Sequence, residues 1–183
     1  MTAFDRIALL SPAHDVAAFD CGSDAQTDWL RRHALQAQQA DTARVFVACV
    51  AGTPRVAGFY ALAAGSVQAE QAPARLARGV GRYPVPVVVL ARLGVDRDAQ
   101  GQRLGSSLVR DAFLQTAAIA ERLGVRALVI PAETPRAAAF YRGLDPAFEP
   151  MPGEPLHLVL LMKDLRKAIG LAATQQTLSG DAS

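Results

Sequence analysis

The stretch PVPVVVLARLGVDRDAQGQRLGSSLVRDAF, residues 84–113, contains an apolar run, a polar loop and the start of a helical pattern. The run 84–95 is too apolar to face water on either side, and its β-branched residues predict a buried central strand. From Leu104 onward, apolar residues that include Leu108 and Phe113 recur on one face, which predicts a helix ending near residues 123–124. The stretch therefore predicts a strand–loop–helix unit at the centre of the fold.

The loop between this strand and helix predicts an anion site. At a helix N-terminus the backbone N–H groups are unpaired and the helix dipole is positive, and glycine lets a phosphate approach the main chain closely. Two well-known phosphate loops are absent, because the chain has no Gly-Lys-Ser/Thr and the loop reads GQRLGS rather than GxGxxG. What remains to be explained is the string QGQRLG at residues 100–105.

The other predicted elements alternate between strands and helices. In chain order we expect a strand at 6–10, a helix from a capping box at 23–26 to about residue 40, strands at 43–52 and 55–67, a connector at 68–84, a strand at 125–131, a short helix at 134–143, and a strand and turn at 157–165. This order predicts a single mixed α/β domain over residues 1–167. Residues 168–183 are expected to form a flexible C-terminal tail.

Composition narrows the class of protein. Hydrophobic residues make up 51% and charged residues 20% of the chain, which is typical of a soluble globular domain. No apolar stretch is long enough to span a membrane, and the N-terminus lacks a basic region followed by an apolar segment, so we expect a cytoplasmic protein without a membrane partner. Two cysteines outside any CxxC pair and three scattered histidines predict no metal site: Cys21, Cys49, His14, His33 and His157.

Positive charge comes almost entirely from arginine, with no lysine before Lys163. The planar guanidinium suits phosphate oxygens better than the point charge of lysine, which favours a phosphate-bearing partner. A GC-rich genome gives the same arginine excess, and composition alone does not separate the two explanations.

The string QGQRLG, after a strand that ends LARLGVDR, resembles the acetyl-CoA pyrophosphate loop of the GNAT acetyltransferases, whose pattern is Arg/Gln-x-x-Gly-x-Gly/Ala. Gln100 and Gly105 fit this pattern, whereas Arg103 occupies the first glycine position. The stretches 19–49, 55–67, 84–97 and 138–143 are similar to one branch, the GNAT-type toxins of bacterial toxin–antitoxin modules that acetylate aminoacyl-tRNA. The resemblance runs in order over about residues 5–165 and implies a GNAT fold, with a central mixed, mostly antiparallel sheet flanked by helices.

This resemblance implies two kinds of contact with acetyl-CoA. Where the strand splays from its neighbour, the main chain of Leu93, Gly94 and Val95 is expected to pair with pantetheine. The phosphates are expected to bind at the loop that follows, at Arg97, Gln100, Gly101, Gln102, Arg103, Leu104, Gly105 and Ser106. Arg103 either adds a phosphate contact or changes the backbone angles of the loop.

The resemblance also implies that Tyr141, in the string AFYRG, is the general acid that protonates the sulfur of CoA. A tyrosine hydroxyl has an unperturbed pKa of about 10 and a thiol one of about 8.5. The family continues quickly from this tyrosine into Gly-Phe, and here Phe148 is the expected equivalent after a longer turn. No general base stands out, because Asp96 and Glu133 are both explained as cap or loop residues. An α-amino group titrates at about 7.7–8.0 and needs little help from a base, which fits aminoacyl-tRNA better than lysine.

A tRNA substrate requires a phosphate-binding face. The candidates are arginines on the first helix, in the connector and on the central strand: Arg31, Arg32, Arg75, Arg78, Arg82 and Arg92. The resemblance further implies a homodimer and a cognate antitoxin of the ribbon–helix–helix type. Two alternatives stay open, a GNAT enzyme acting on a small amine or a protein amino group, and a non-catalytic acyl-CoA-binding module. The presence of Tyr141 argues against the second alternative.

Overall fold

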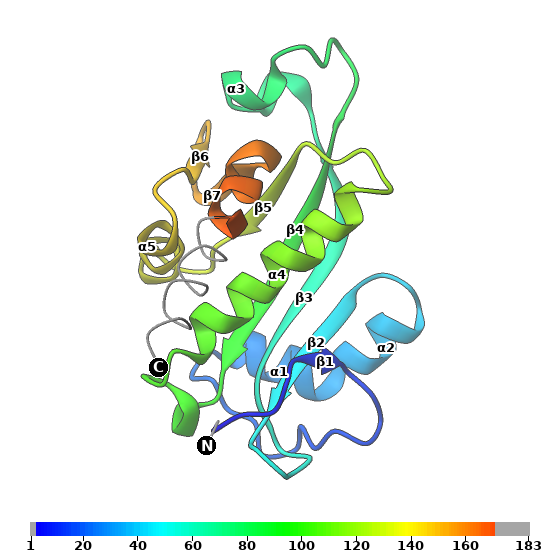
Figure 1. The fold of residues 1–183 in the computed structure, drawn as a ribbon, viewed down its shortest axis with the longest axis vertical. Helices are drawn as coiled ribbons and strands as arrows, with labels where there is room; N and C mark the ends of the chain where they lie inside the picture. The colour runs from blue at the N-terminus through cyan, green and yellow to red at the C-terminus, as the bar shows by residue number, and fades with distance from the viewer. Residues whose placement is uncertain (1–2, 171–183) are drawn as a thin grey trace. The chain divides into compact units, whose positions relative to one another are not determined.

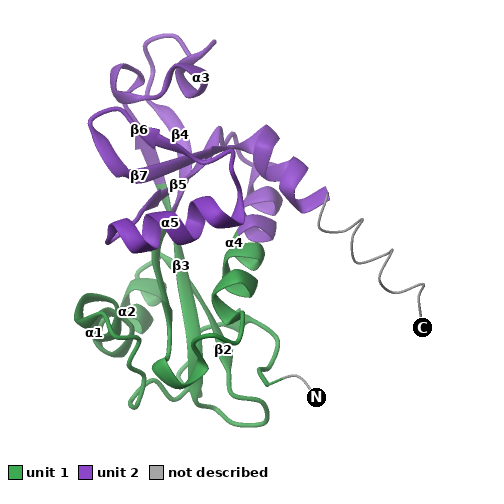
Figure 2. Cartoon of the chain, turned by 90° about the vertical axis from the view of Figure 1, so that its left-hand side faces the viewer, with its two compact units in different colours: residues 1–64, 90–112 green, residues 65–89, 113–183 purple. Residues whose placement is uncertain are grey.

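The computed structural model describes residues 3–170, and the chain divides into two compact units (Figure 2). Unit 1 contains residues 1–64 and 90–112, and unit 2 contains residues 65–89 and 113–183. Each unit is therefore built from two separate stretches of the chain. Two strands and one helix each have residues in both units, so the boundaries between the units fall inside regular elements.

The elements follow the order that the sequence predicts, with additions (Figure 1). The strands are β1 (Ala8–Leu9), β2 (Arg44–Cys49), β3 (Val56–Val67), β4 (Val85–Val95), β5 (Ala127–Pro131), β6 (Glu149–Met151) and β7 (Glu154–Leu161). The helices are α1 (Asp24–Arg32), α2 (Ala34–Gln39), η1 (Ala69–Gln71), α3 (Ala74–Ala77), η2 (Arg97–Ala99), α4 (Leu104–Ala120) and α5 (Pro135–Leu144), followed by a helical segment at 162–170.

The described strands form one mixed sheet in the order β1-β2-β3-β4-β5-β7-β6. Strand β4 pairs in parallel with β5 over Val87–Val89, whereas the pairs β1–β2, β2–β3, β5–β7 and β6–β7 are antiparallel. The prediction of a mixed, mostly antiparallel sheet with helices is confirmed. Strand β6 was not predicted, because it has three residues, one of them proline, and is defined by its pairing with β7.

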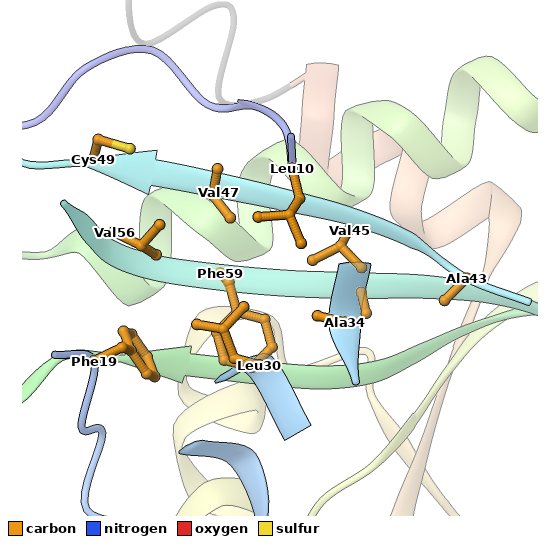
Figure 3. Packing of buried hydrophobic residues seen from close by; sticks show 11 residues of the cluster. Leu10, Phe19, Leu30, Ala34, Ala43, Val45, Val47, Cys49, Val56 and Phe59 are labelled. Atoms are coloured by element: carbon orange, nitrogen blue, oxygen red, sulfur yellow. The ribbon is translucent and has the colours of Figure 1, made fainter. Parts of the chain in front are cut away.

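In unit 1 the core lies between β2, β3 and the first two helices (Figure 3). Phe59 of β3 is fully buried, with Phe19 edge-on at 5.5 Å and Trp29 stacked at 6.1 Å between ring centroids. Helix α1 begins as predicted, because the Ser23 hydroxyl accepts a hydrogen bond from the Gln26 backbone N–H at 3.3 Å. The predicted single helix to residue 40 is wrong, since His33 departs from helical backbone angles and separates α1 from α2.

In unit 2 an apolar core covers β5 and β7 and extends to the connector, where Leu76 of α3 is fully buried. Helix α5 begins with Thr134, whose side chain accepts a hydrogen bond from the Ala137 N–H at 3.1 Å, and Pro135 occupies the first turn. The connector contains the short helices η1 and α3. The last strand is Glu154–Leu161, so it begins three residues before the predicted start at residue 157. Residues 162–170 form a helix where the sequence predicts a turn.

The predicted flexible tail, residues 168–183, lies from residue 171 onward outside the described residues. Residues 168–170 still belong to the last helix. Across the part of the chain that the structure describes, no helix is both long and apolar enough to cross a membrane.

Candidate functional site

Asp96, at the end of β4, organises the loop that follows. Its side chain is buried, and its Oδ1 and Oδ2 accept hydrogen bonds from the backbone N–H groups of Asp98 and Asp20, respectively, each at 3.1 Å. Arg55 Nη2 also donates to Oδ1, at 3.4 Å. Its own N–H donates to the Ala57 carbonyl at 2.8 Å. A carboxylate used in this way caps η2 and joins the loop to two other segments, which supports its interpretation as a cap rather than a base.

The side chains of the two glutamines in the loop donate hydrogen bonds to backbone carbonyls of the protein itself. The Gln100 side-chain amide donates to the carbonyls of Val95 at 3.0 Å and Cys21 at 3.1 Å, and Gln102 donates to the Asp98 carbonyl at 2.9 Å. These side chains hold the loop in shape. Any ligand contact from these two residues is therefore expected from the main chain.

Arg103, which stands where the family has glycine, has a left-handed backbone with φ +63°. Gly101 is also left-handed, with φ +76°. Arg103 thus has a conformation that glycine adopts freely and that costs a residue with a Cβ atom on the order of 1–2 kcal/mol. The Arg103 carbonyl accepts the first bonds of α4, from the N–H and hydroxyl of Ser107 at 3.2 and 3.3 Å.

The N-terminus of α4 is fixed by two buried leucines. Leu104 and Leu108 pack over Gly58 of β3 so closely that a Cβ atom at Gly58 would lie 2.9 Å from a methyl carbon of each. The N–H groups of the first turn, at residues 104–106, have no acceptor within the helix. Gly105 and Ser106 are only half-buried, so these donors lie at an accessible turn beside the exposed Arg103.

Arg97 already has an anionic partner. Its Nε donates to Asp20 Oδ2 at 3.0 Å, and its backbone N–H donates to the Asp20 carbonyl at 2.9 Å. The pKa of Asp20 is lowered, mainly by the hydrogen bond from the Gly22 N–H and also by the charge of Arg97. A phosphate at Arg97 would share its guanidinium with this carboxylate. Nothing in the composition of the segment 19–22 predicts this contact.

Gly94, in the strand segment expected to contact pantetheine, is required by packing. A Cβ atom there would lie 2.9 Å from the Phe59 ring and 3.2 Å from the sulfur of Cys21. Leu93 and Val95 on either side are half-buried. The main-chain contacts of this segment with pantetheine stay a prediction.

Tyr141, in α5 of unit 2, is 6% exposed. Its ring centroid lies 5.2 Å from that of Phe140 and 6.5 Å from that of Phe148, which in turn packs against Phe113 at 6.2 Å. Burial raises the pKa of Tyr141 above its ordinary value. Among the described residues its hydroxyl has no hydrogen-bond partner. The turn after α5 thus places the Phe148 ring beside the Tyr141 ring. Phe148 is the residue that the sequence predicts to be the equivalent of the family's phenylalanine.

Three of the arginines that are predicted to bind nucleic acid lie in unit 1, and each has different neighbours. Arg92 of β4 lies over the Trp29 ring, 5.4 Å from its centroid, which is a cation–π contact. On α1, Arg32 lies 3.8 Å from Asp28, and both side chains are exposed. Arg31 contributes to the lowered pKa of Asp20.

In unit 2 the three connector arginines differ from one another. Arg75 is paired with Glu149 and with Asp164, the latter at 2.8 Å, so its charge is already neutralised. The side chains of Arg78 and Arg82 have no acidic partner within the described residues. From their spacing in the sequence the three arginines are equivalent. In the structure Arg75 is in ion pairs, whereas Arg78 and Arg82 are in no ion pair with a described acidic residue.

The described residues contain no cluster of three or more His, Cys, Asp or Glu side chains arranged to hold a metal ion. Glu133, the second acid considered as a base, is exposed.

Comparison with known proteins identifies the family. Residues 8–145 match the Acetyltransferase (GNAT) family. A tRNA-acetylating toxin of Mycobacterium tuberculosis (strain ATCC 25618 / H37Rv) is 45% identical over 170 residues, which cover 93% of this chain and 99% of the relative.

Two solved structures of the toxin AtaT share the fold. AtaT complexed with acetyl-methionyl-tRNAfMet has a TM-score of 0.79 at 26% identity, over 88% of this chain and 96% of that chain. A tyrosine-to-phenylalanine mutant of AtaT, bound to the C-terminus of the antitoxin AtaR and to acetyl-CoA, has a TM-score of 0.74 at 26% identity, over 90% of this chain and 96% of that chain. Together with the family match and the loop geometry, these likenesses show that the chain is a member of the GNAT acetyltransferase family.

Proposed function

We propose that this protein is a toxin-type N-acetyltransferase, which moves the acetyl group of acetyl-CoA to the α-amino group of aminoacyl-tRNA and thereby inhibits translation. The observation that carries the proposal is the 45% identity with a tRNA-acetylating toxin across 93% of the chain. The loop at residues 96–107 supports it, because this loop has the donors that a pyrophosphate requires.

For the acetyl-CoA cosubstrate, we propose that the N–H groups at the start of α4 and the Arg103 guanidinium hold the pyrophosphate. The fit rests on two features of the chain. The first-turn N–H groups lack acceptors and lie at a positive helix end, and Arg103 is exposed without a partner in the described residues. The main chain of Leu93–Val95 is proposed to hold pantetheine. Acetyl-CoA supplies the activated thioester.

Tyr141 is proposed as the general acid. The amine attacks the thioester carbon, the carbon–sulfur bond breaks, the nitrogen loses one proton to solvent, and the sulfur gains one from the tyrosine hydroxyl. The tyrosinate then recovers its proton from solvent. A tyrosine hydroxyl is protonated throughout the neutral range, so the proton is present for transfer. Burial raises the pKa of Tyr141, which makes its hydroxyl a weaker acid than that of an exposed tyrosine. The rings of Phe140 and Phe148 restrict the orientation of its ring.

A dedicated base is not required for this substrate. An α-amino group with a pKa of about 7.7–8.0 is partly unprotonated at neutral pH, whereas a lysine amine with a pKa of about 10.4 is almost fully protonated. Asp96 is committed to the loop backbone. The chain is therefore better suited to an α-amino group than to a lysine side chain.

We propose that Arg78 and Arg82, with the helix arginines Arg31 and Arg32 and with Arg92, contact the tRNA. Replacing Arg78 and Arg82 by Ala should weaken RNA binding and leave acetyl-CoA affinity intact. Equal loss of both affinities, or loss of neither, contradicts this assignment. Because aminoacyl-tRNA is cytoplasmic, we place the protein in the cytoplasm. A homodimer and a ribbon–helix–helix antitoxin are proposed as its assembly and partner.

The deciding experiment incubates the protein with labelled acetyl-CoA and a pool of charged tRNA. Label should appear on the aminoacyl group, and Tyr141→Phe should reduce its rate by about 100-fold or more. Tyr83→Phe, which alters a highly exposed tyrosine, is the matched control and should transfer label like the unaltered protein. Absence of label on tRNA, with acetyl-CoA binding intact, would favour a small amine or a protein amino group as the substrate.

A further inference from the structure

Unit 2 contains a pocket of about 350 Å³ with a strongly basic lining. We call it the basic pocket, and its lining residues are Arg75, Arg78, Val125, Arg126, Leu161, Met162, Lys163 and Arg166. Five of these eight residues are basic and none is acidic. Two of the cations are connector arginines that the sequence predicts to bind nucleic acid, Arg75 and Arg78. The others are Arg126, which directly precedes β5, and Lys163 and Arg166 of the last helix.

Two of the cations are held in place by the protein itself. Arg126 donates from Nη2 to the carbonyls of Leu76 at 3.3 Å and Arg78 at 2.8 Å, which fixes the connector to the start of β5. Arg75 is fixed by its pairs with Glu149 and Asp164. Both hydrogen bonds of Arg126 leave from one nitrogen, so its other N–H groups keep donors for a ligand.

The other three cations have no acidic partner in the described residues. Arg78, Lys163 and Arg166 share one pocket, where like charges repel and an anion between them is favoured. The apolar side chains of Val125, Leu161 and Met162 complete the lining, and such a surface strengthens ionic contacts by excluding water. Arginine forks bind phosphate oxygens in a bidentate manner, which favours a phosphodiester over a single carboxylate.

We propose that the basic pocket binds a backbone phosphate of the tRNA, through Arg78, Arg126, Lys163 and Arg166. This inference rests on the proposed function, since it assigns a contact to the same RNA substrate. The pocket is formed by folded elements on both sides, so the site is ready before the RNA arrives. The connector arginine Arg78 thereby acts together with the last helix rather than alone.

The test measures the affinity for uncharged tRNA between about 50 and 200 mM salt, which requires no acetyl transfer. The variants are Lys163→Ala/Arg166→Ala and, from a different element, Arg78→Ala. Lys167→Ala is the matched control, because Lys167 is exposed on the same helix and does not line the pocket. The salt slope is the steepness with which the logarithm of the tRNA affinity falls with the logarithm of the salt concentration. The double variant should lower this slope by about two, so that its loss of affinity across the range should be about ten-fold smaller than that of the unaltered protein. Arg78→Ala should lower the slope by about one, and the control should not change it.

Acetyl-CoA affinity is measured on the same proteins, because CoA also has phosphates. Weakened tRNA binding with unchanged acetyl-CoA binding supports the proposal. An unchanged tRNA slope in the variants overturns it, even if the unaltered protein acetylates charged tRNA. Weakened acetyl-CoA binding with unchanged tRNA binding would assign the pocket to the cosubstrate and also overturn it. The proposed function itself is tested separately, in the experiment with labelled acetyl-CoA, where absence of label on charged tRNA would contradict it.

Discussion

The left-handed backbone at Arg103 predicts an unusual order of stability among its variants. We compare Arg103→Gly with Arg103→Ala. Both remove the guanidinium and its proposed phosphate contact, so the pair differs only in the Cβ atom. With φ at +63°, the alanine keeps the steric clash of the left-handed region and the glycine relieves it.

The magnitude follows from two opposing terms. Relief of the left-handed clash favours glycine by about 1–2 kcal/mol, and the larger freedom of glycine in the unfolded chain disfavours it by about 0.5–1 kcal/mol. We expect the free energy of unfolding of Arg103→Gly to exceed that of Arg103→Ala by about 1 kcal/mol. For a chain of this length, that difference shifts the melting temperature by about 2–4 °C.

Urea unfolding of both variants, analysed with a common slope, measures the difference directly. Gly124→Ala provides a control of opposite sign, because Gly124 does not have a left-handed φ and has open space around its Cα. There alanine should stabilise by about 0.4–1 kcal/mol. If Arg103→Ala proves at least as stable as Arg103→Gly, the reasoning from the backbone conformation is refuted.

Three further predictions concern unit 1 and the two buried tyrosines. Gly94→Ala should lower the free energy of unfolding by about 1–3 kcal/mol in urea titrations, because its methyl group would meet the Phe59 ring at 2.9 Å. Tyr60→Phe should cost about 1.5–3 kcal/mol by the same assay, since it removes the hydroxyl that donates to Asp111. Burial raises the pKa of both Tyr60 and Tyr141, so unfolded tyrosines ionise first above pH of about 10. Stability should then fall by about 1.4 kcal/mol per pH unit for each tyrosine, and Tyr60→Phe should reduce the total slope by that amount.

Local signals in the sequence predicted the elements well. The apolar run 84–95, the cap at Ser23 and the proline at the start of α5 depend on neighbouring residues, and each corresponds to an observed strand or helix end. The break at His33 and the short strand β6 were missed, and β6 is defined by its pairing with β7. Propensity favours one continuous helix through His33, and a three-residue strand has no periodicity to detect.

The loop and the start of α4 at residues 100–106 were predictable from the sequence, whereas the contacts around them were not. That this loop binds an anion stays a prediction. The pairing of Arg97 with Asp20 joins residues far apart in the chain, which no pattern in one sequence reveals. The same holds for Arg75, whose partners Glu149 and Asp164 follow it by more than seventy positions. Sequence spacing identifies charged residues, but only the folded chain decides which charges are already neutralised.

The interleaving of the two units has a consequence during synthesis. Unit 1 has all of its residues once Ala112 has emerged from the ribosome, whereas unit 2 still lacks everything from Phe113 onward. A polypeptide released at that stage has the loop at residues 96–107 and lacks Tyr141. If the protein stops translation as proposed, synthesis of its own chain that is interrupted before residue 141 yields fragments without the proposed general acid, and we expect these fragments to be inactive.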